Sequence, residues 1–160
     1  MATKQGTLAL LDDPVAQTLL RSTTPARLAY VGHDGGPRVV PIWFHWNGHE
    51  VVFGTPPKAP KVKALSPSAR VALSIDGNTW PYKVLQIRGT AHVETVSGVV
   101  PEYAMAAERY FGFEQGRAWV NQVGGMFSRM ARIVVKPEWV AVLDFEQRFP
   151  SAIEAAMSGH

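Results

Sequence analysis

The stretch Arg38-Val39-Val40-Pro41-Ile42-Trp43-Phe44-His45-Trp46 is apolar on both sides of the extended chain that it predicts. Alternate residues of a strand face opposite ways, so one face carries Val40, Ile42, Phe44 and Trp46, and the other carries Val39, Pro41, Trp43 and His45. Two apolar faces in a chain this small predict that a second subunit, a flat ligand, or both cover the outer face. A proline in mid-strand also leaves a gap in the hydrogen-bond ladder. The alternative is that Trp43 and Trp46 are ordinary core residues.

Strand patterns dominate the rest of the chain. Alternating apolar residues and turn signals predict strands at 27–33, 38–46, 49–54, 70–76, 84–94, 132–135 and 139–145, and helices at 14–22, 60–66, 101–111 and 114–123. The turns at 34–37 and at Asn47-Gly48 make the first three strands an antiparallel meander. Gly89 marks a bulge or a bend in its strand. Many short antiparallel strands predict a mainly β fold, a small closed β-barrel with inserted helices, with an open sandwich as the alternative.

The length of 160 residues predicts one domain. We divide it into an N-terminal helix (1–24), barrel strands with a basic loop (25–95), a helical insertion (96–131), final strands (132–146) and a tail (147–160). The net charge of +3 is mild and the charges are dispersed, which argues against nucleic acid as a partner. Cysteine is absent, and no apolar run approaches the ~18 residues of a membrane helix. We therefore expect a cytoplasmic protein without disulfides or a membrane anchor.

A basic loop follows the third predicted strand. Lys58, Lys61 and Lys63 lie within six residues, and Thr55 adds a hydroxyl group. Prolines at 56, 57 and 60 stiffen this loop, so that little entropy would be lost when an anion binds. The alternative is a solvated turn, the commonest role of lysines in a proline-rich loop.

Alternate residues of the predicted strand at 84–94 fall on an apolar face and a polar face. One face, with Leu85 and Ile87, belongs to the core, whereas Gln86 and Arg88 face the other way. They follow Trp80-Pro81-Tyr82, and an amide at this place could bind the polar edge of a ring. The alternative is a solvated barrel face with a cross-strand ion pair.

Motifs for hydrolysis, nucleotide triphosphates or metals are not found. The sequence lacks Gly-x-Ser-x-Gly and a phosphate loop that ends in Gly-Lys-Ser/Thr. The five histidines include no helical pair four residues apart, and the acidic residues are scattered. We therefore assign no catalytic residue and no metal ligand.

Together these segments resemble the split β-barrel flavoproteins related to pyridoxamine 5′-phosphate oxidase, including their deazaflavin (F420)-dependent branch. The resemblance covers about residues 25–95. It is carried by Ala29-Tyr30-Val31-Gly32-His33-Asp34-Gly35-Gly36-Pro37, Val40-Pro41-Ile42-Trp43-Phe44, Phe53-Gly54-Thr55-Pro56, Lys61-Val62-Lys63-Ala64-Leu65, Arg70-Val71-Ala72-Leu73 and Gln86-Ile87-Arg88-Gly89-Thr90-Ala91. It implies an FMN-binding type of split barrel and a homodimer with two cofactors at the subunit interface.

The resemblance also implies roles for individual residues. Val39, Val40, Pro41 and Ile42 would line the cofactor ring, and Gln86 would approach its edge. Thr55 and Lys61 would hold the phosphate with help from Lys58 and Lys63, while Trp80 and Tyr82 would come from the partner subunit. The expected cofactor is FMN, with F420 as the alternative.

The implied function is an oxidoreductase that transfers hydride or electrons to or from a small molecule, with the cofactor as the carrier. The alternative is a non-catalytic split-barrel protein that binds or senses a flavin or haem. Lys63-Ala64 stands where the family often has Arg-Asn, and a lysine offers a point charge in place of a planar fork. The arginine-rich C-terminal segment that grips substrate in true pyridoxamine phosphate oxidases is missing, so vitamin B6 oxidation is not expected.

Overall fold

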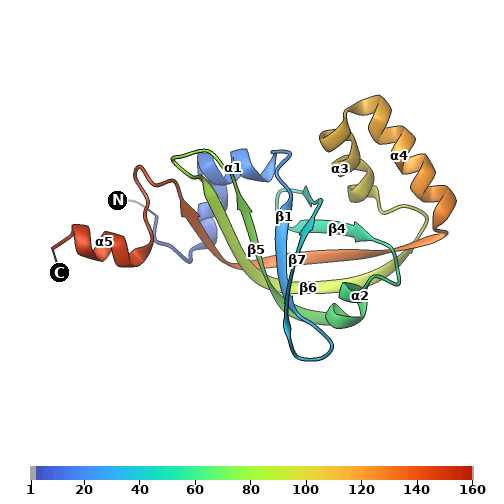
Figure 1. Ribbon diagram of the computed structural model, residues 1–160, viewed down its shortest axis with the longest axis horizontal. Helices are drawn as coiled ribbons and strands as arrows, with labels where there is room; N and C mark the ends of the chain where they lie inside the picture. Colours follow the sequence, from blue (N-terminus) through green and yellow to red (C-terminus); the bar gives the residue numbers. More distant parts are fainter. Residues whose placement is uncertain (1–2, 160) are drawn as a thin grey trace.

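A computed structural model describes residues 3–159 (Figure 1). The strands are β1 (Ala26–Val31), β2 (Pro37–Ile42), β3 (His45–Trp46), β4 (Val51–Thr55), β5 (Ser68–Asp76), β6 (Val84–Ser97) and β7 (Arg129–Leu143). The helices are the 3₁₀ helix η1 (Leu8–Asp12), α1 (Pro14–Leu20), α2 (Pro60–Leu65), α3 (Pro101–Phe111), α4 (Phe113–Met126) and α5 (Ser151–Met157). The predicted mainly β class is confirmed.

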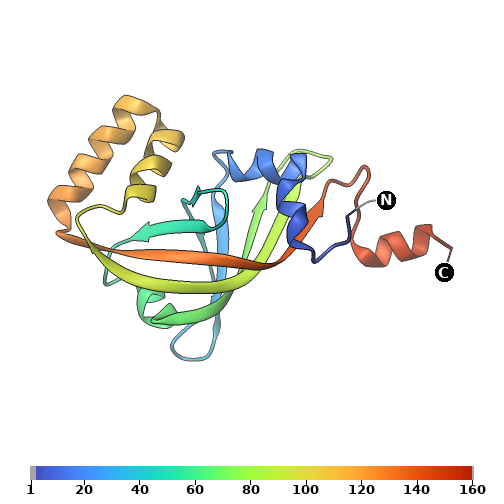
Figure 2. The same ribbon diagram turned by 180° about the vertical axis from the view of Figure 1, so that it is seen from behind.

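The strands form one antiparallel sheet in the order β2-β1-β5-β6-β7-β4-β3. Its two end strands, β2 and β3, are consecutive in the chain and only two residues apart. The two ends of the sheet therefore meet, and the sheet curls into a split barrel (Figures 1 and 2). Large side chains that are at most 1% exposed, such as Leu28, Phe53, Ile87 and Ile133, fill its interior.

The predicted strand at 38–46 is wrong in one respect. Its first part, β2, pairs with β1, whereas its last two residues form β3 and pair with β4. The first three strands are therefore not a simple meander. Between the two parts, Phe44 is fully buried and the backbone changes partners, which is the point where the barrel splits.

The predicted strands at 132–135 and 139–145 are one strand, β7. Lys136, Pro137 and Glu138 separate the two predicted ranges but belong to β7. In the structure Gly89 pairs with Pro137 while Arg88 pairs with Trp139, so Glu138 is an extra residue in a β-bulge. A bulge tolerates the missing N–H of proline, which is why β7 continues. The predicted bulge at Gly89 is confirmed.

The helix α3 packs against β3 and β4, and α4 packs against α3 (Figure 2). Trp43 leaves the barrel to stack on Tyr110 of α3, with ring centroids 5.1 Å apart. Arg109 donates hydrogen bonds to the carbonyls of Ser22 and Phe44. Arg132 donates to Glu102 through Nε at 2.8 Å, and this bond holds the pKa of Glu102 below its usual value.

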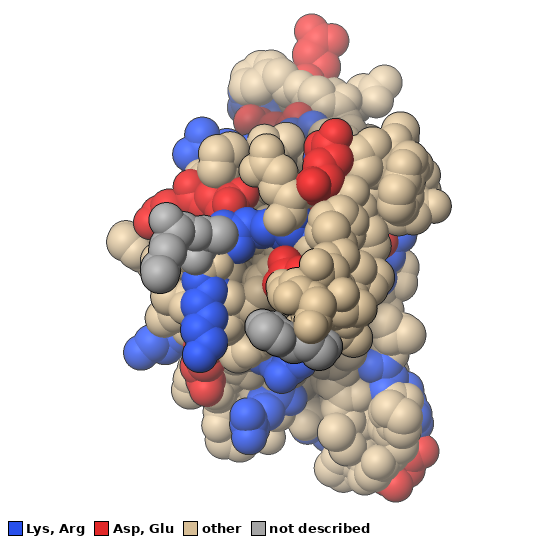
Figure 3. Space-filling model, turned by 90° about the vertical axis from the view of Figure 1, so that its left-hand side faces the viewer, with Lys and Arg blue, Asp and Glu red and all other residues tan. Residues whose placement is uncertain are grey.

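The opposite end of the molecule carries both chain ends and α5, in which none of the seven residues is buried (Figure 1). Lysine and arginine side chains lie among aspartate and glutamate side chains on this face, with uncharged residues between them (Figure 3). The longest described helix, α4, has 14 residues, and no helix within residues 3–159 is long and apolar enough to cross a membrane.

Candidate functional site

The end of β4 and the start of α2 bring two of the predicted site residues together. Thr55 closes β4 and is only 4% exposed, one of the few buried polar residues. Lys61, in the first turn of α2, is half-buried and donates from Nζ to Thr55 Oγ1 at 3.4 Å. Burial lowers the pKa of Lys61. The pair is therefore a partly enclosed cation beside a hydroxyl group.

Lys58 and Lys63 flank this pair and are exposed. In the described part of the chain, none of these three lysines has a carboxylate oxygen within 4 Å of its amine. The α2 helix contacts β1, β5 and β6, so the lysines lie at the end of the barrel where these strands meet. The four predicted phosphate ligands lie within nine residues of the chain, which we call the lysine cluster, and an anion could bind at its Thr55–Lys61 pair.

The strand β2 presents its predicted ring-binding residues in two ways. Val40 and Ile42 pack against the core, whereas Val39 is 66% exposed and Pro41 is also exposed. Within the described residues β2 pairs with β1 alone, so Pro41 stands in an edge strand, where its missing N–H costs no ladder bond. The predicted outer apolar face is thus exposed at Val39 and Pro41, whereas Trp43 is half-buried against Tyr110 of α3.

Gln86 lies across the sheet from β2 on the same outer face. The register aligns Pro41 with Arg27, Arg27 with Ser74, and Ser74 with Gln86. A shallow hollow of about 250 Å³ is lined by Val39, Arg27 and Gln86 among others. Val39 and Gln86, predicted from separate segments, therefore face one surface.

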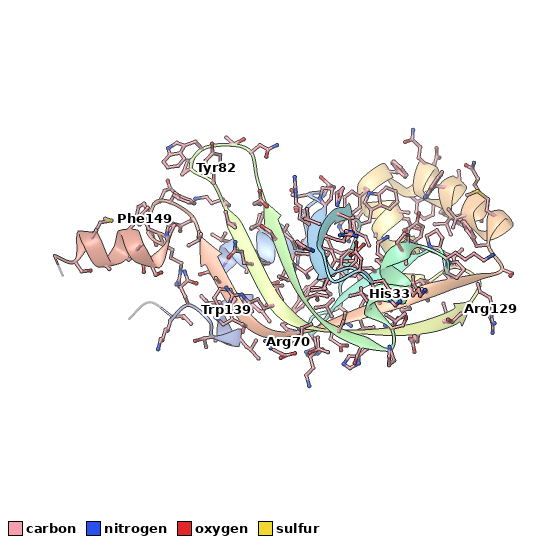
Figure 4. The ribbon with its side chains drawn as sticks, turned by 60° about the horizontal axis from the view of Figure 1, so that its bottom comes forward. His33, Arg70, Tyr82, Arg129, Trp139 and Phe149 are labelled. Carbon is pink, nitrogen blue, oxygen red and sulfur yellow. The ribbon has the colours of Figure 1, made fainter. Side chains whose placement is uncertain are left out.

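A larger hollow of about 610 Å³ adjoins the first and shares Ala29, Ala72 and Arg88 with it. We call it the arginine hollow. Arg88 lies over the Trp139 ring, 3.9 Å from the centroid, and Arg70 stands on the same face (Figure 4). Arg27 and Arg70 are not among the predicted site residues; the outward-facing positions of β1 and β5 are the signal that could have found them.

Within one chain, Trp80 and Tyr82 lie far from the lysine cluster. They lie in the loop between β5 and β6, at the far end of these strands from α2 (Figures 1 and 4). The nine residues of β5 separate the two places by about 30 Å. Trp80 is 64% and Tyr82 42% exposed, and both pack on Phe145. One chain alone therefore does not assemble the whole predicted set.

Comparison with known protein families gives the family. The model described as pyridoxamine 5′-phosphate oxidase matches residues 13–144, which include the barrel, the lysine cluster and the helical insertion. The chain belongs to the pyridoxamine 5′-phosphate oxidase family. The resemblance inferred from the sequence is thereby confirmed, as is the split-barrel fold. No curated protein sequence matches the chain.

Solved structures agree with this membership. An F420 reductase is 27% identical with a TM-score of 0.57, and the alignment covers 78% of this chain and 94% of the other. A conserved hypothetical protein from Mycobacterium tuberculosis is 22% identical with a TM-score of 0.63, covering 90% and 91%. The haem storage protein HutZ from Vibrio cholerae is 15% identical with a TM-score of 0.58, covering 81% and 93%. The last two similarities concern the fold alone.

Proposed function

We propose that this family member binds a flavin-type cofactor and is an oxidoreductase that transfers hydride or electrons to or from a small molecule. The observation that carries the proposal is the Thr55–Lys61 pair. A half-buried ammonium group costs free energy unless an anion accompanies it, and no described carboxylate does so. A cofactor phosphate supplies that anion, with Lys58 and Lys63 adding to the local positive charge.

The ring of the cofactor would lie on the outer face of β2. Val39 and Pro41 offer an exposed apolar surface, and Val40 and Ile42 hold the strand against the core. Gln86 provides an amide that can both donate and accept at the polar edge of a ring. These residues bind and orient the cofactor and keep water from one side of it.

We favour F420 over FMN as the cofactor. F420 carries a longer acidic tail, and the arginine hollow beside the proposed ring surface offers Arg70 and Arg88 to such a tail. The 27% identity with an F420 reductase supports the same choice. FMN is the second candidate, because one terminal phosphate needs only the compact cluster around Lys61.

The proposed site is shared between two subunits. Trp80 and Tyr82 are too far from Lys61 to contact the same cofactor from one chain, but those of a second copy could. The uncovered apolar surface of β2 supports a homodimer that would bury it. A cytoplasmic location also remains a prediction.

A bound flavin-type ring would supply the hydride chemistry, so the protein would need to offer no acid, base or nucleophile. This agrees with the absence of a catalytic motif from the sequence. The chain would fix the distance between ring and substrate and exclude water. No catalytic residue is assigned.

A non-catalytic protein that binds or senses a flavin or haem is the second candidate function. It is supported by the fold shared with the haem storage protein HutZ. A turnover assay distinguishes an enzyme from a protein that only binds the cofactor. Reduced cofactor mixed with the protein and a quinone acceptor should be oxidised faster than without protein if the chain is an enzyme, and at the same rate if it only binds.

The binding proposal is tested by titrating the purified protein with F420 and, separately, with FMN, while the cofactor fluorescence is followed. We expect saturable binding of both and tighter binding of F420. Tighter binding of FMN would reverse the choice of cofactor. Binding of neither would overturn the proposed function.

A further inference from the structure

A second hollow, of about 540 Å³, lies away from the lysine cluster, between α1 and the loop that joins β5 to β6. We call it the apolar hollow. Its α1 wall includes Val15 and Leu19, and its loop wall includes Trp80 and Pro81. A hydrogen bond from Gly77 N to Lys83 O at 3.1 Å closes the base of the loop. Its volume falls within the range of small-molecule sites, roughly 300 to 1,000 Å³.

The charge of the lining restricts what can bind there. Lys83 is the one charged residue on the wall, and its Nζ lies 2.6 Å from Glu146 Oε2. This ion pair leaves no unpaired charge among the lining residues to hold an ionic ligand. The side chains of Thr18 and Asn78 add a hydroxyl group and an amide. The lining therefore suits a neutral molecule that is mostly apolar and has a polar group at one end.

We infer that the apolar hollow is a binding site for a neutral, largely apolar small molecule. The large exposed indole of Trp80 supports this inference. Its ring packs edge-on against Tyr82, with centroids 5.3 Å apart, and at a tilt against Phe145, 5.6 Å away. These contacts hold the indole as a rigid wall that is 64% exposed. An apolar ligand would cover part of this surface and gain roughly 25 cal/mol for each Å² removed from water.

This inference rests on the hollow between α1 and the β5–β6 loop, and it shares only Trp80 with the proposed cofactor site, which would use that residue from the partner subunit. The two sites differ in chemistry: Arg70 and Arg88 of the arginine hollow have no described carboxylate oxygen within 4 Å, whereas Lys83 of the apolar hollow is paired with Glu146. A pair of probes can therefore separate them. N-phenyl-1-naphthylamine and 1-anilinonaphthalene-8-sulfonate share one aromatic framework, and only the second is charged. The neutral probe should prefer the apolar hollow, and the sulfonate should prefer the arginines.

The test titrates the full-length protein with each probe and follows probe fluorescence. Thr18 is exposed on α1 and lines the hollow, so Thr18→Phe should fill it without disturbing the core. Asn78→Phe fills it from the loop side. Gln122→Phe makes the same kind of change at an exposed position of α4 and is the control. Circular dichroism confirms the folding of each variant.

We expect one neutral probe per chain and at least about tenfold weaker binding of the sulfonate at this site. Thr18→Phe and Asn78→Phe should each lower the affinity for the neutral probe by about tenfold or more, and Gln122→Phe should leave that affinity unchanged. If Thr18→Phe does not fold, Asn78→Phe decides. The inference is overturned if the neutral probe does not saturate, or if the folded Phe variants at 18 and 78 bind it as tightly as the wild type.

Discussion

Lys61 Nζ donates a hydrogen bond to Thr55 Oγ1 at 3.4 Å, although the two residues belong to different elements. The five intervening residues include three prolines, which hold the turn from β4 into α2 in one shape. The distance is long for a hydrogen bond, so an oxygen of a bound phosphate could replace the hydroxyl as the partner of the amine. The pair is therefore preorganised for an anion.

Lys61→Ala should weaken cofactor binding by about 1.5 to 3 kcal/mol, because a charge-assisted hydrogen bond is lost. Isothermal titration calorimetry with F420 measures the change. Lys63→Ala is the matched control; this side chain is exposed, so the effect should be smaller. Equal affinities for the wild type and Lys61→Ala would remove Lys61 from the site.

Glu102→Gln should destabilise the fold by about 1 to 3 kcal/mol at pH 7, because Arg132 loses its less exposed partner. The folded-state pKa of Glu102 is lowered, chiefly by its hydrogen bond with Arg132. Its stabilising effect is thus fully present above the ordinary pKa of 4.5 and is lost as the pH falls through the lower folded-state value. Urea unfolding at several pH values measures this effect. The free energies of unfolding of the wild type and Glu102→Gln should become equal at acid pH.

The control for that series is Glu94→Gln. Glu94 binds the same arginine at 2.9 Å, but its side chain is 58% exposed, so the change should cost less than about 1 kcal/mol. A stability difference between wild type and Glu102→Gln that stays constant from neutral to acid pH would contradict the assigned ion pair.

Gly89→Ala should destabilise the barrel by at least about 2 kcal/mol. A Cβ at this position would stand 2.1 Å from the carbonyl oxygen of Lys136, and the bulge that accommodates Pro137 would have to open. Chemical denaturation gives the free energy. Gly125→Ala, in α4 with open space around it, should be neutral or slightly stabilising. A similar effect of both substitutions would show that the bulge is not tightly fixed.

A shared site predicts complementation between subunits. Lys61→Ala and Tyr82→Ala each impair both sites of their own homodimer. A mixed dimer of the two has one site with both residues intact and one with neither. After equal mixing and subunit exchange, roughly a quarter of the sites should regain wild-type affinity. Cofactor titration of the mixture measures this fraction. A binding curve equal to the mean of the curves of the two separate variants would argue against a shared site.

Local patterns in the sequence predicted much of the fold. The alternation of Leu85 and Ile87 with Gln86 and Arg88 places these residues on the faces that the structure shows. The closeness of Thr55 and Lys61 was also predictable, because a short stiff loop joins their elements. Each of these features depends on neighbours within a few residues.

Features that depend on distant partners were not predictable. Whether β2 and β3 are one strand depends on β1 and β4, which compete for the same segment. The continuity of β7 through Pro137 depends on Gly89, nearly fifty residues earlier in the chain. Arg27 belongs to the candidate site only because the strand register aligns it with Ser74 of β5, which in turn is aligned with Gln86 of β6.

The central claim is that a phosphate-bearing flavin-type cofactor binds where two copies of this chain meet. Sedimentation velocity with detection at the cofactor's own absorbance tests it directly, because it reports the size of the species that carries the cofactor. We expect F420 or FMN to sediment with a dimer, with one cofactor for each chain. Cofactor that sediments only as free small molecule, or with a monomer, would contradict it.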